Sequence, residues 1–311
     1  MFDVLKLGVL DLVPVLAGAE PAAALAEALR LARLADSNGY SRYWVAEHHD
    51  MPQLACTSPE VLLAHIGSHT QRIRLGSGAL LLPHYKPLKV AESFHLLATL
   101  YPGRIDLGLG RAPGGSAHVA IALSGNFLEH VRQLPESLKD LTELLSGSYR
   151  MEGEPVLARP VPPIAPEVWM LGTNRKSAAY AAEFGTGYVF GQFMSDQDGE
   201  EAISAYRREF RPSPLTPKPR TMIAVGVVCA ETEDKARELA AASRLFARSE
   251  EPEAGKSSAD RKILAGTPEQ VKKRLEELQH TYGNDEFLIV TMTANYETRL
   301  RSYELLSGAI G

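Results

Sequence analysis

Cysteine is scarce in this 311-residue sequence, and long apolar runs are missing. The two cysteines, Cys56 and Cys229, are far apart, which gives neither a disulfide framework nor the ligand spacing of a zinc site. No stretch approaches the ~20 apolar residues of a membrane helix. The apolar segment 9–19 lacks the basic start and unbroken run of a signal peptide. We therefore expect a reducing, cytoplasmic compartment and no membrane contact.

Basic residues do not outnumber acidic ones. The chain has 33 Lys and Arg against 38 Asp and Glu, so its formal net charge is −5. Broad electrostatic binding of nucleic acid needs a concentrated basic face, which this balance argues against. The hydrophobic share of 45% is typical of a globular protein and argues against a disordered chain, a collagen-like repeat or a coiled coil.

Apolar, β-rich runs alternate with helical patterns along the chain. The expected strands are 4–10, 42–46, 73–82, 105–109, 167–171, 187–190, 222–229 and 287–292. The expected helices are 21–38, one starting at 59 after an N-cap at 58, 89–100, about 126–145, 175–184, 198–210, 232–247, 268–282 and 297–307.

Eight strands, each followed by a helix, predict parallel βαβ units and fit a closed (β/α)8 TIM barrel with insertions. The alternative is a doubly wound open sheet, which favours a glycine-rich turn directly after the first strand. Residues 10–14 read Leu-Asp-Leu-Val-Pro instead, so the barrel is favoured. We expect one domain over residues 1–311.

Three segments interrupt the alternation. Residues 148–166 are rich in Pro and Glu and predict an excursion or a hairpin, and residues 211–219 hold four prolines and predict a loop. Residues 249–261 are charged and rich in small residues, which predicts a mobile loop.

Active sites of such barrels lie at the carboxyl ends of the strands. Glu47, His48, His49 and Asp50 directly follow the second expected strand. A neutral histidine there can transfer protons or hydrogen-bond a ligand, whereas the alternative is a polar loop that caps backbone groups. A metal site at His48 and His49 is disfavoured, because adjacent residues rarely chelate one ion. We predict no metal.

The next two strand ends suggest a flat ligand and an anion. Residues 76–79 are small, which permits a flat molecule to approach the backbone or simply forms a tight corner. Arg111 follows the fourth strand in a glycine-flanked loop. Its guanidinium suits a phosphate or a carboxylate, and the alternative is an ion pair with Asp106.

The fifth strand ends at Gly172, just before a helix that begins near Asn174. A helix N-terminus is a ready anion site, and Thr173, Asn174 and Ser177 add side-chain donors. An ordinary N-cap by Thr173 or Asn174 is the alternative, and both can hold at once. Residues 192–193 after the sixth strand either contact a ligand or pack.

These motifs together resemble the bacterial luciferase-like family of flavin-dependent monooxygenases. The resemblance covers nearly the whole chain and is most similar to the single-gene, alkanal-monooxygenase-like branch. It is carried by residues 44–49 (WVAEHH), 76–83, 102–111 (PGRIDLGLGR), 171–174 (LGTN) and 177–178.

The resemblance implies a barrel that binds reduced FMN. Glu47 and His48 match the acidic and catalytic histidine positions. Gly78-Ala79 matches a segment, often a cis peptide, beneath the isoalloxazine ring. The remaining implied cofactor-binding residues are Arg111, Asn174 and Ser177 at the phosphate, with Gly110, Leu171 and Gly172.

Two positions differ from the family pattern. Asn174 stands where many relatives have Ser, and Gly110 stands where light-emitting members have a reactive Cys, which argues against luminescence.

The implied reaction uses reduced FMN and O2 to oxygenate a small apolar molecule, an aldehyde being one candidate, through a C4a-peroxyflavin. Such chemistry needs a dry pocket, for which Leu80, Leu81 and Phe193 are candidate wall residues. The implied partners are a separate flavin reductase and a second copy of the chain, which would pack through the helices after strands two and three. The alternatives are a flavin- or deazaflavin-dependent reductase or dehydrogenase, a non-catalytic flavin-binding protein and a metal-dependent barrel hydrolase.

Overall fold

The computed structural model describes residues 5–197, 199–247, 262–284 and 286–310. Its strands are β1 (Lys6–Asp11), β2 (Arg42–Val45), β3 (Arg74–Ser77), β4 (Leu80–Leu81), β5 (Ile105–Gly110), β6 (Arg150–Met151), β7 (Glu154–Pro155), β8 (Glu167–Gly172), β9 (Gly187–Gly191), β10 (Thr221–Cys229), β11 (Ile263–Gly266) and β12 (Glu286–Val290).

The helices alternate with these strands. They are α1 (Pro21–Ser37), α2 (Pro59–Gly67), α3 (Pro87–Leu100), α4 (Ala117–Ser124), α5 (Phe127–Arg132), α6 (Leu134–Ser146), α7 (Arg175–Glu183), α8 (Gly199–Glu209), α9 (Glu233–Ala247), α10 (Pro268–Tyr282) and α11 (Tyr296–Ile310), with short 3-10 turns η1 (Leu82–His84) and η2 (Gln192–Met194).

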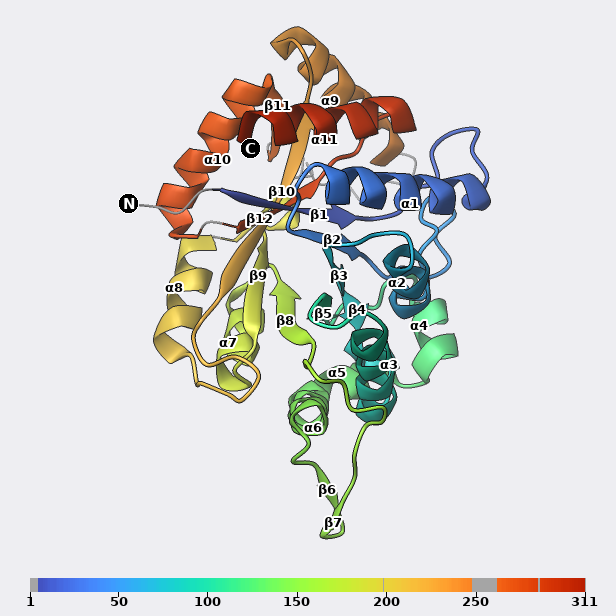
Figure 1. Ribbon diagram of the computed structural model, residues 1–311, viewed down its shortest axis with the longest axis vertical. Coiled ribbons are helices and arrows are strands. Elements are labelled where there is room, and N and C mark those ends of the chain that lie inside the picture. Colours follow the sequence, from blue (N-terminus) through green and yellow to red (C-terminus); the bar gives the residue numbers. More distant parts are fainter. Residues whose placement is uncertain (1–4, 198, 248–261, 285, 311) are drawn as a thin grey trace.

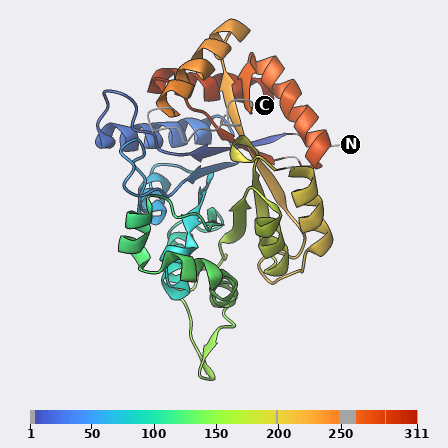
Figure 2. The same cartoon turned by 180° about the vertical axis from the view of Figure 1, so that it is seen from behind.

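Eight parallel strands in the described part of the chain close into a barrel (Figures 1 and 2). The order is β1-β2-β3-β5-β8-β9-β10-β12, and β12 returns to β1, so that Val9 pairs with Tyr43 on one side and with Ile289 on the other. The helices pack around the outside of this ring. The predicted (β/α)8 barrel is therefore confirmed, and the open sheet is excluded.

The strand predicted over 73–82 is wrong, because the structure divides it into β3, β4 and η1. The Gly78–Ala79 peptide bond between β3 and β4 is cis. The Gly78 amide still donates to Val45 O of β2, but the Leu81 amide donates to the Glu47 side chain. A side-chain oxygen thus replaces the backbone carbonyl of a neighbouring strand as the acceptor, and the regular strand ends here.

The prediction of a single helix over about 126–145 is also wrong. Two helices, α5 and α6, cover this segment, and the short helix α4 precedes them. Pro135 lies in the first turn of α6, where its missing N–H is tolerated, whereas it would interrupt a continuous helix. The side chains of Ser116 and Asn126 accept hydrogen bonds from the first turns of α4 and α5.

Strand β11 was not predicted. It pairs with the end of β10, from Gly226 to Cys229, whereas β9 pairs only with the start of β10.

The segment 148–166 forms the predicted hairpin, β6–β7, which projects from the barrel in Figure 1. Segment 211–219 is a loop, as predicted. The mobile loop predicted over 249–261 lies outside the described residues.

Two tryptophans fill the inside of the barrel. Trp44 of β2 and Trp169 of β8 are fully buried and meet edge to face, with ring centroids 6.1 Å apart. A Cβ atom on Gly76 would lie 2.5 Å from Trp44 Nε1, so only glycine leaves room for this ring. A second, larger apolar layer packs the strands against the helices.

The two cysteine thiols are free and buried, and burial raises the pKa of each to about 12. Cys229 packs in the core at the end of β10, and its amide donates a hydrogen bond to Ser302 Oγ at 2.8 Å. Within the described residues no helix has the length and apolarity needed to cross a membrane.

A network of ion pairs between side chains lies at the amino ends of the strands, which form the floor of the barrel. The Asp106 carboxylate accepts hydrogen bonds from Arg42 Nη1 at 2.7 Å, Trp44 Nε1 at 2.9 Å and Arg74 Nε at 2.9 Å. Glu167 and Glu286 add further acceptors for Arg42. Asp106 therefore pairs with Arg42 and Arg74, not with Arg111.

Replacing Asp106 with Ala should destabilise the fold by about 3–5 kcal/mol, because two guanidinium groups lose their buried counter-ion. Urea unfolding followed by circular dichroism measures this change. Glu92→Ala is the control, since Glu92 forms an exposed pair with Lys89, at 3.8 Å, whose loss should cost less than about 1 kcal/mol. Equal stability of the two variants would contradict the prediction.

Candidate active site

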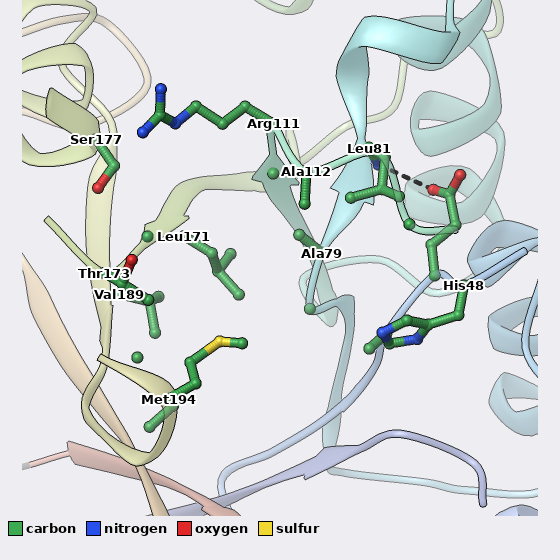
Figure 3. Close-up of a pocket in the computed structure, with 18 of the residues that line it drawn as sticks. His48, Ala79, Leu81, Arg111, Ala112, Leu171, Thr173, Ser177, Val189 and Met194 are labelled. Carbon is green, nitrogen blue, oxygen red and sulfur yellow. Dashed lines mark hydrogen bonds between the residues drawn. The ribbon is translucent and has the colours of Figure 1, made fainter. Parts of the chain in front are cut away.

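A cavity of about 670 Å³ lies at the carboxyl ends of the barrel strands. All ten residues predicted from the sequence line it: Glu47, His48, Gly78, Ala79, Gly110, Arg111, Leu171, Gly172, Asn174 and Ser177. In Figure 3 the Arg111 side chain extends toward Ser177, and His48 lies on the opposite side of the cavity. The closed barrel thus brings the ends of four strands, β2, β3, β5 and β8, to one space.

His48 presents a neutral imidazole to this cavity. The residue follows β2, and its backbone amide donates a hydrogen bond to Cys56 O at 2.9 Å. Its Nδ1 atom is buried and has no hydrogen-bond partner among the described residues. Burial is the largest influence on the ring and lowers the pKa of His48, the nearby His49 acts in the same direction, and the Ala46 backbone opposes them. A buried nitrogen without a partner is available to a ligand.

Glu47 is fully buried and holds several parts of the cavity wall together. Its Oε1 atom lies 2.7 Å from His49 Nε2 and accepts a hydrogen bond from the Tyr85 hydroxyl at 2.9 Å. Its Oε2 accepts from the Leu81 amide at 2.9 Å, the dashed line in Figure 3. Burial and the Glu47 charge raise the pKa of Tyr85 well above its ordinary value, so the phenol keeps its proton and donates.

One wall of the cavity is mostly backbone. It contains the Gly78–Ala79 peptide, whose cis geometry agrees with the expectation from the resemblance. A Cβ atom on Gly110 would lie 3.0 Å from Ala79 Cβ and 3.2 Å from Leu81 Cδ2, which is tighter than normal contact. A Cβ on Gly172 would overlap Ser177. Glycines at these positions keep the wall flat.

Arg111 is the cation of the cavity, and no hydrogen bond or ion pair joins its side chain to another described residue. Its predicted alternative partner, Asp106, is occupied at the floor of the barrel. A guanidinium in this state can bind a phosphate or a carboxylate in a bidentate manner.

The N-terminus of α7 faces the same cavity. Asn174 Oδ1 accepts from the Lys176 amide at 3.1 Å and from the Ser177 amide at 3.3 Å, so Asn174 is the N-cap. The Ser177 hydroxyl donates to Asn174 O at 2.7 Å. Both side chains are therefore engaged within the helix turn, and the positive end of the helix dipole still points into the cavity.

The remaining walls are apolar, and the sequence reasoning missed part of them. Leu81 and Phe193 line the cavity as predicted, whereas Leu80 packs in the core between strands and helices. The larger apolar residues missed are Leu10, Leu12, Phe127, Leu128, Val131, Val189 and Met194. The proline that separates α5 from α6 was the signal that a distinct short helix, α5, covers this side.

The pKa of His48 should lie below the ordinary histidine value of about 6.5, because burial disfavours the imidazolium. The unfolded chain then takes up a proton at higher pH than the native protein. His48 therefore contributes stability above that ordinary value, and the contribution is lost as the pH falls toward the lower native value. NMR titration of histidine-labelled protein, with His48→Gln for assignment, measures the native value. A value at or above 6.5 would contradict this account.

The family model of luciferase-like monooxygenases matches residues 5–285. Among curated proteins, the Bacillus subtilis protein YwcH is 41% identical, with 98% of each chain covered. Among solved structures, apo-MsnO8 has 37% identity, a TM-score of 0.89 and 98% coverage of each chain. The oxygenating constituent of 3,6-diketocamphane monooxygenase from Pseudomonas putida, in complex with FMN, has the same fold at 21% identity, with a TM-score of 0.77 and 98% coverage of each chain. The chain belongs to the luciferase-like monooxygenase family.

Proposed function

We propose that this enzyme uses reduced FMN and O2 to oxygenate a small, uncharged, apolar organic molecule. The observation that carries the proposal is a single cavity with two facing sides. Arg111, which has no partner among the described residues, and a helix N-terminus lie at one side, and His48, whose buried Nδ1 has no described partner, lies at the other. The likeness to an FMN-bound monooxygenase of the same fold supports the choice of cofactor.

The residues of the cavity fit FMN. A dianionic phosphate matches Arg111 and the N-terminus of α7. The glycine-lined wall at Gly78 and Gly110 suits a flat ring system. The cavity volume, about 670 Å³, is within the range of cofactor and small-molecule sites.

Bound reduced FMN would supply the oxygen chemistry. The chain would supply four functions around it. Arg111 would hold the phosphate, and the apolar walls would exclude water. Of the two predicted catalytic residues, His48 would hold or move a proton at Nδ1, the buried atom without a partner. Glu47 would position the Gly78–Leu81 segment, since three donors already occupy its carboxylate.

The lining favours an uncharged substrate. The ionisable residues among its described members are Glu47, His48 and Arg111. Glu47 is saturated by neighbours, His48 is neutral, and Arg111 is assigned to the cofactor. The remaining side chains, from Leu10 to Ala224, are mostly apolar, so an aldehyde or another neutral molecule is the substrate class we propose.

We also propose a separate reductase as the source of reduced flavin and a second copy of the chain as a partner. Exposed apolar side chains on the helices after β2 and β3 support the dimer: Val61 of α2 is 66% exposed, and Leu96 and Leu100 of α3 are 50% and 54% exposed. The two free thiols support a cytoplasmic location.

Replacing His48 with Ala should lower turnover about a hundredfold or more while flavin affinity stays nearly unchanged, because the residue is assigned to proton handling. Single-turnover assays with reduced FMN, ¹⁸O2 and a panel of aldehydes would measure labelled product. His65→Ala, an exposed change on α2, is the control. An equal loss of flavin binding and turnover would refute the role. Wild-type turnover of reduced FMN without ¹⁸O in any product would refute the monooxygenase proposal.

Replacing Arg111 with Ala should weaken FMN binding about ten- to hundredfold, the cost of losing a charged hydrogen bond. Riboflavin, which lacks the phosphate, should bind wild type and variant alike. Fluorescence titration of both flavins measures this difference. Arg175→Ala is the matched control, because Arg175 lies in the first turn of α7 but pairs with Glu201 on the surface. Equal binding of FMN and riboflavin to the wild type would refute the phosphate site at Arg111.

A further inference from the structure

His84 ends the 3-10 turn η1, beside the cavity but not among its lining residues. Its Nε2 lies 2.9 Å from Pro113 O, and its Nδ1 lies 3.0 Å from Ser124 Oγ. Its ring stacks on Phe127, with centroids 5.0 Å apart and an interplanar angle of 29°. One imidazole thus joins η1 to the loop after β5, to the end of α4 and to the start of α5.

Two of these contacts lead directly to cavity residues. Pro113 belongs to the loop that begins with Arg111, and Phe127 is itself part of the apolar wall. The neighbouring carbonyl, Gly114 O, is held by the His49 amide at 2.8 Å. The Arg111 loop is therefore held at two successive carbonyl groups. The bond to Gly114 O comes from a backbone amide, whereas the bond to Pro113 O comes from the His84 side chain and can be removed by substitution.

The partners of His84 define its tautomer. A carbonyl oxygen only accepts hydrogen bonds, so Nε2 must carry the hydrogen that is donated to Pro113 O. Nδ1 lies 3.0 Å from the Ser124 hydroxyl, which also lies 3.1 Å from Ala120 O, a hydrogen-bond acceptor within α4. An aliphatic side chain provides neither bond, and a phenyl ring provides only the stack on Phe127.

We propose that His84 is a positioning residue for the phosphate end of the flavin site, which it serves by holding the Arg111 loop through Pro113 O. The inference rests on the proposed function, in which Arg111 holds the FMN phosphate. A loop that is ordered before binding loses less conformational freedom when the ligand arrives, so affinity rises without any new contact to the ligand. The effect of His84 must therefore appear in the affinity for FMN and not in the affinity for riboflavin.

The test compares FMN and riboflavin binding by fluorescence titration in His84 variants. His84→Ala should lower the ratio of FMN to riboflavin affinity about five- to tenfold, the equivalent of one lost hydrogen bond with a net value of about 1 kcal/mol. His84→Phe should lower the ratio equally. Because phenylalanine keeps a ring that can stack on Phe127, this variant tests the role even if the alanine variant folds poorly. His84→Gln, whose amide N–H can donate to Pro113 O, should restore most of the ratio.

His69→Ala is the matched control. His69 follows α2, and its Nδ1 lies 2.9 Å from Ser68 Oγ and 3.0 Å from His65 O, so these contacts stay at the end of that helix, away from η1 and the Arg111 loop. The ratio should therefore stay at the wild-type value in this variant. An unchanged ratio in both His84→Ala and His84→Phe, while Arg111→Ala lowers it, would overturn the role of His84 alone. An unchanged ratio in Arg111→Ala would instead overturn the phosphate assignment in the proposed function.

Discussion

The mouth of this barrel is organised around one buried carboxylate. Glu47 binds the Leu81 amide, the His49 ring and the Tyr85 hydroxyl, so the ends of β2 and β4 and the approach to α3 are tied to the same group. A buried carboxylate needs such donors, because an unsatisfied charge would be very costly to bury. The same bonds hold in place the cis peptide wall between β3 and β4, against which we place the flavin.

Polar groups divide between the two ends of the barrel according to what they do. At the floor, the buried Asp106 and Arg42 and the partly buried Arg74 satisfy one another in an ion-pair network. At the mouth, Arg111 has no partner among the described residues, and His48 Nδ1 has none either. Residues with matched partners support the fold, whereas residues that remain unmatched in a concave site are those expected to meet a ligand.

Much of the architecture followed from local patterns. Alternating strand and helix signals predicted the eight barrel strands. The rule that sites lie at strand ends pointed to part of the cavity, and the family resemblance implied the full set of ten residues. The failures occurred where a distant residue decided the local structure. Glu47 interrupts the strand predicted over 73–82, and β11 exists because the end of β10 lies beyond β9 and is available for pairing. The residues next to these segments in the sequence include neither Glu47 nor β10, so a local pattern could not predict either outcome.

The amino-acid sequence by itself determined the order of strands and helices, the small residues at positions 76–79 and the polar residues that follow each strand. These are properties of neighbours in the chain, and hydrophobic period and turn chemistry report them. Only the tertiary structure decided which polar groups are satisfied. In the folded protein Asp106 pairs with Arg42 and Arg74. Leu80 packs in the core, whereas Leu81 lines the cavity. His84 bonds to the carbonyl of Pro113. Such pairings depend on distances between residues far apart in the chain, which exist only once the barrel has closed.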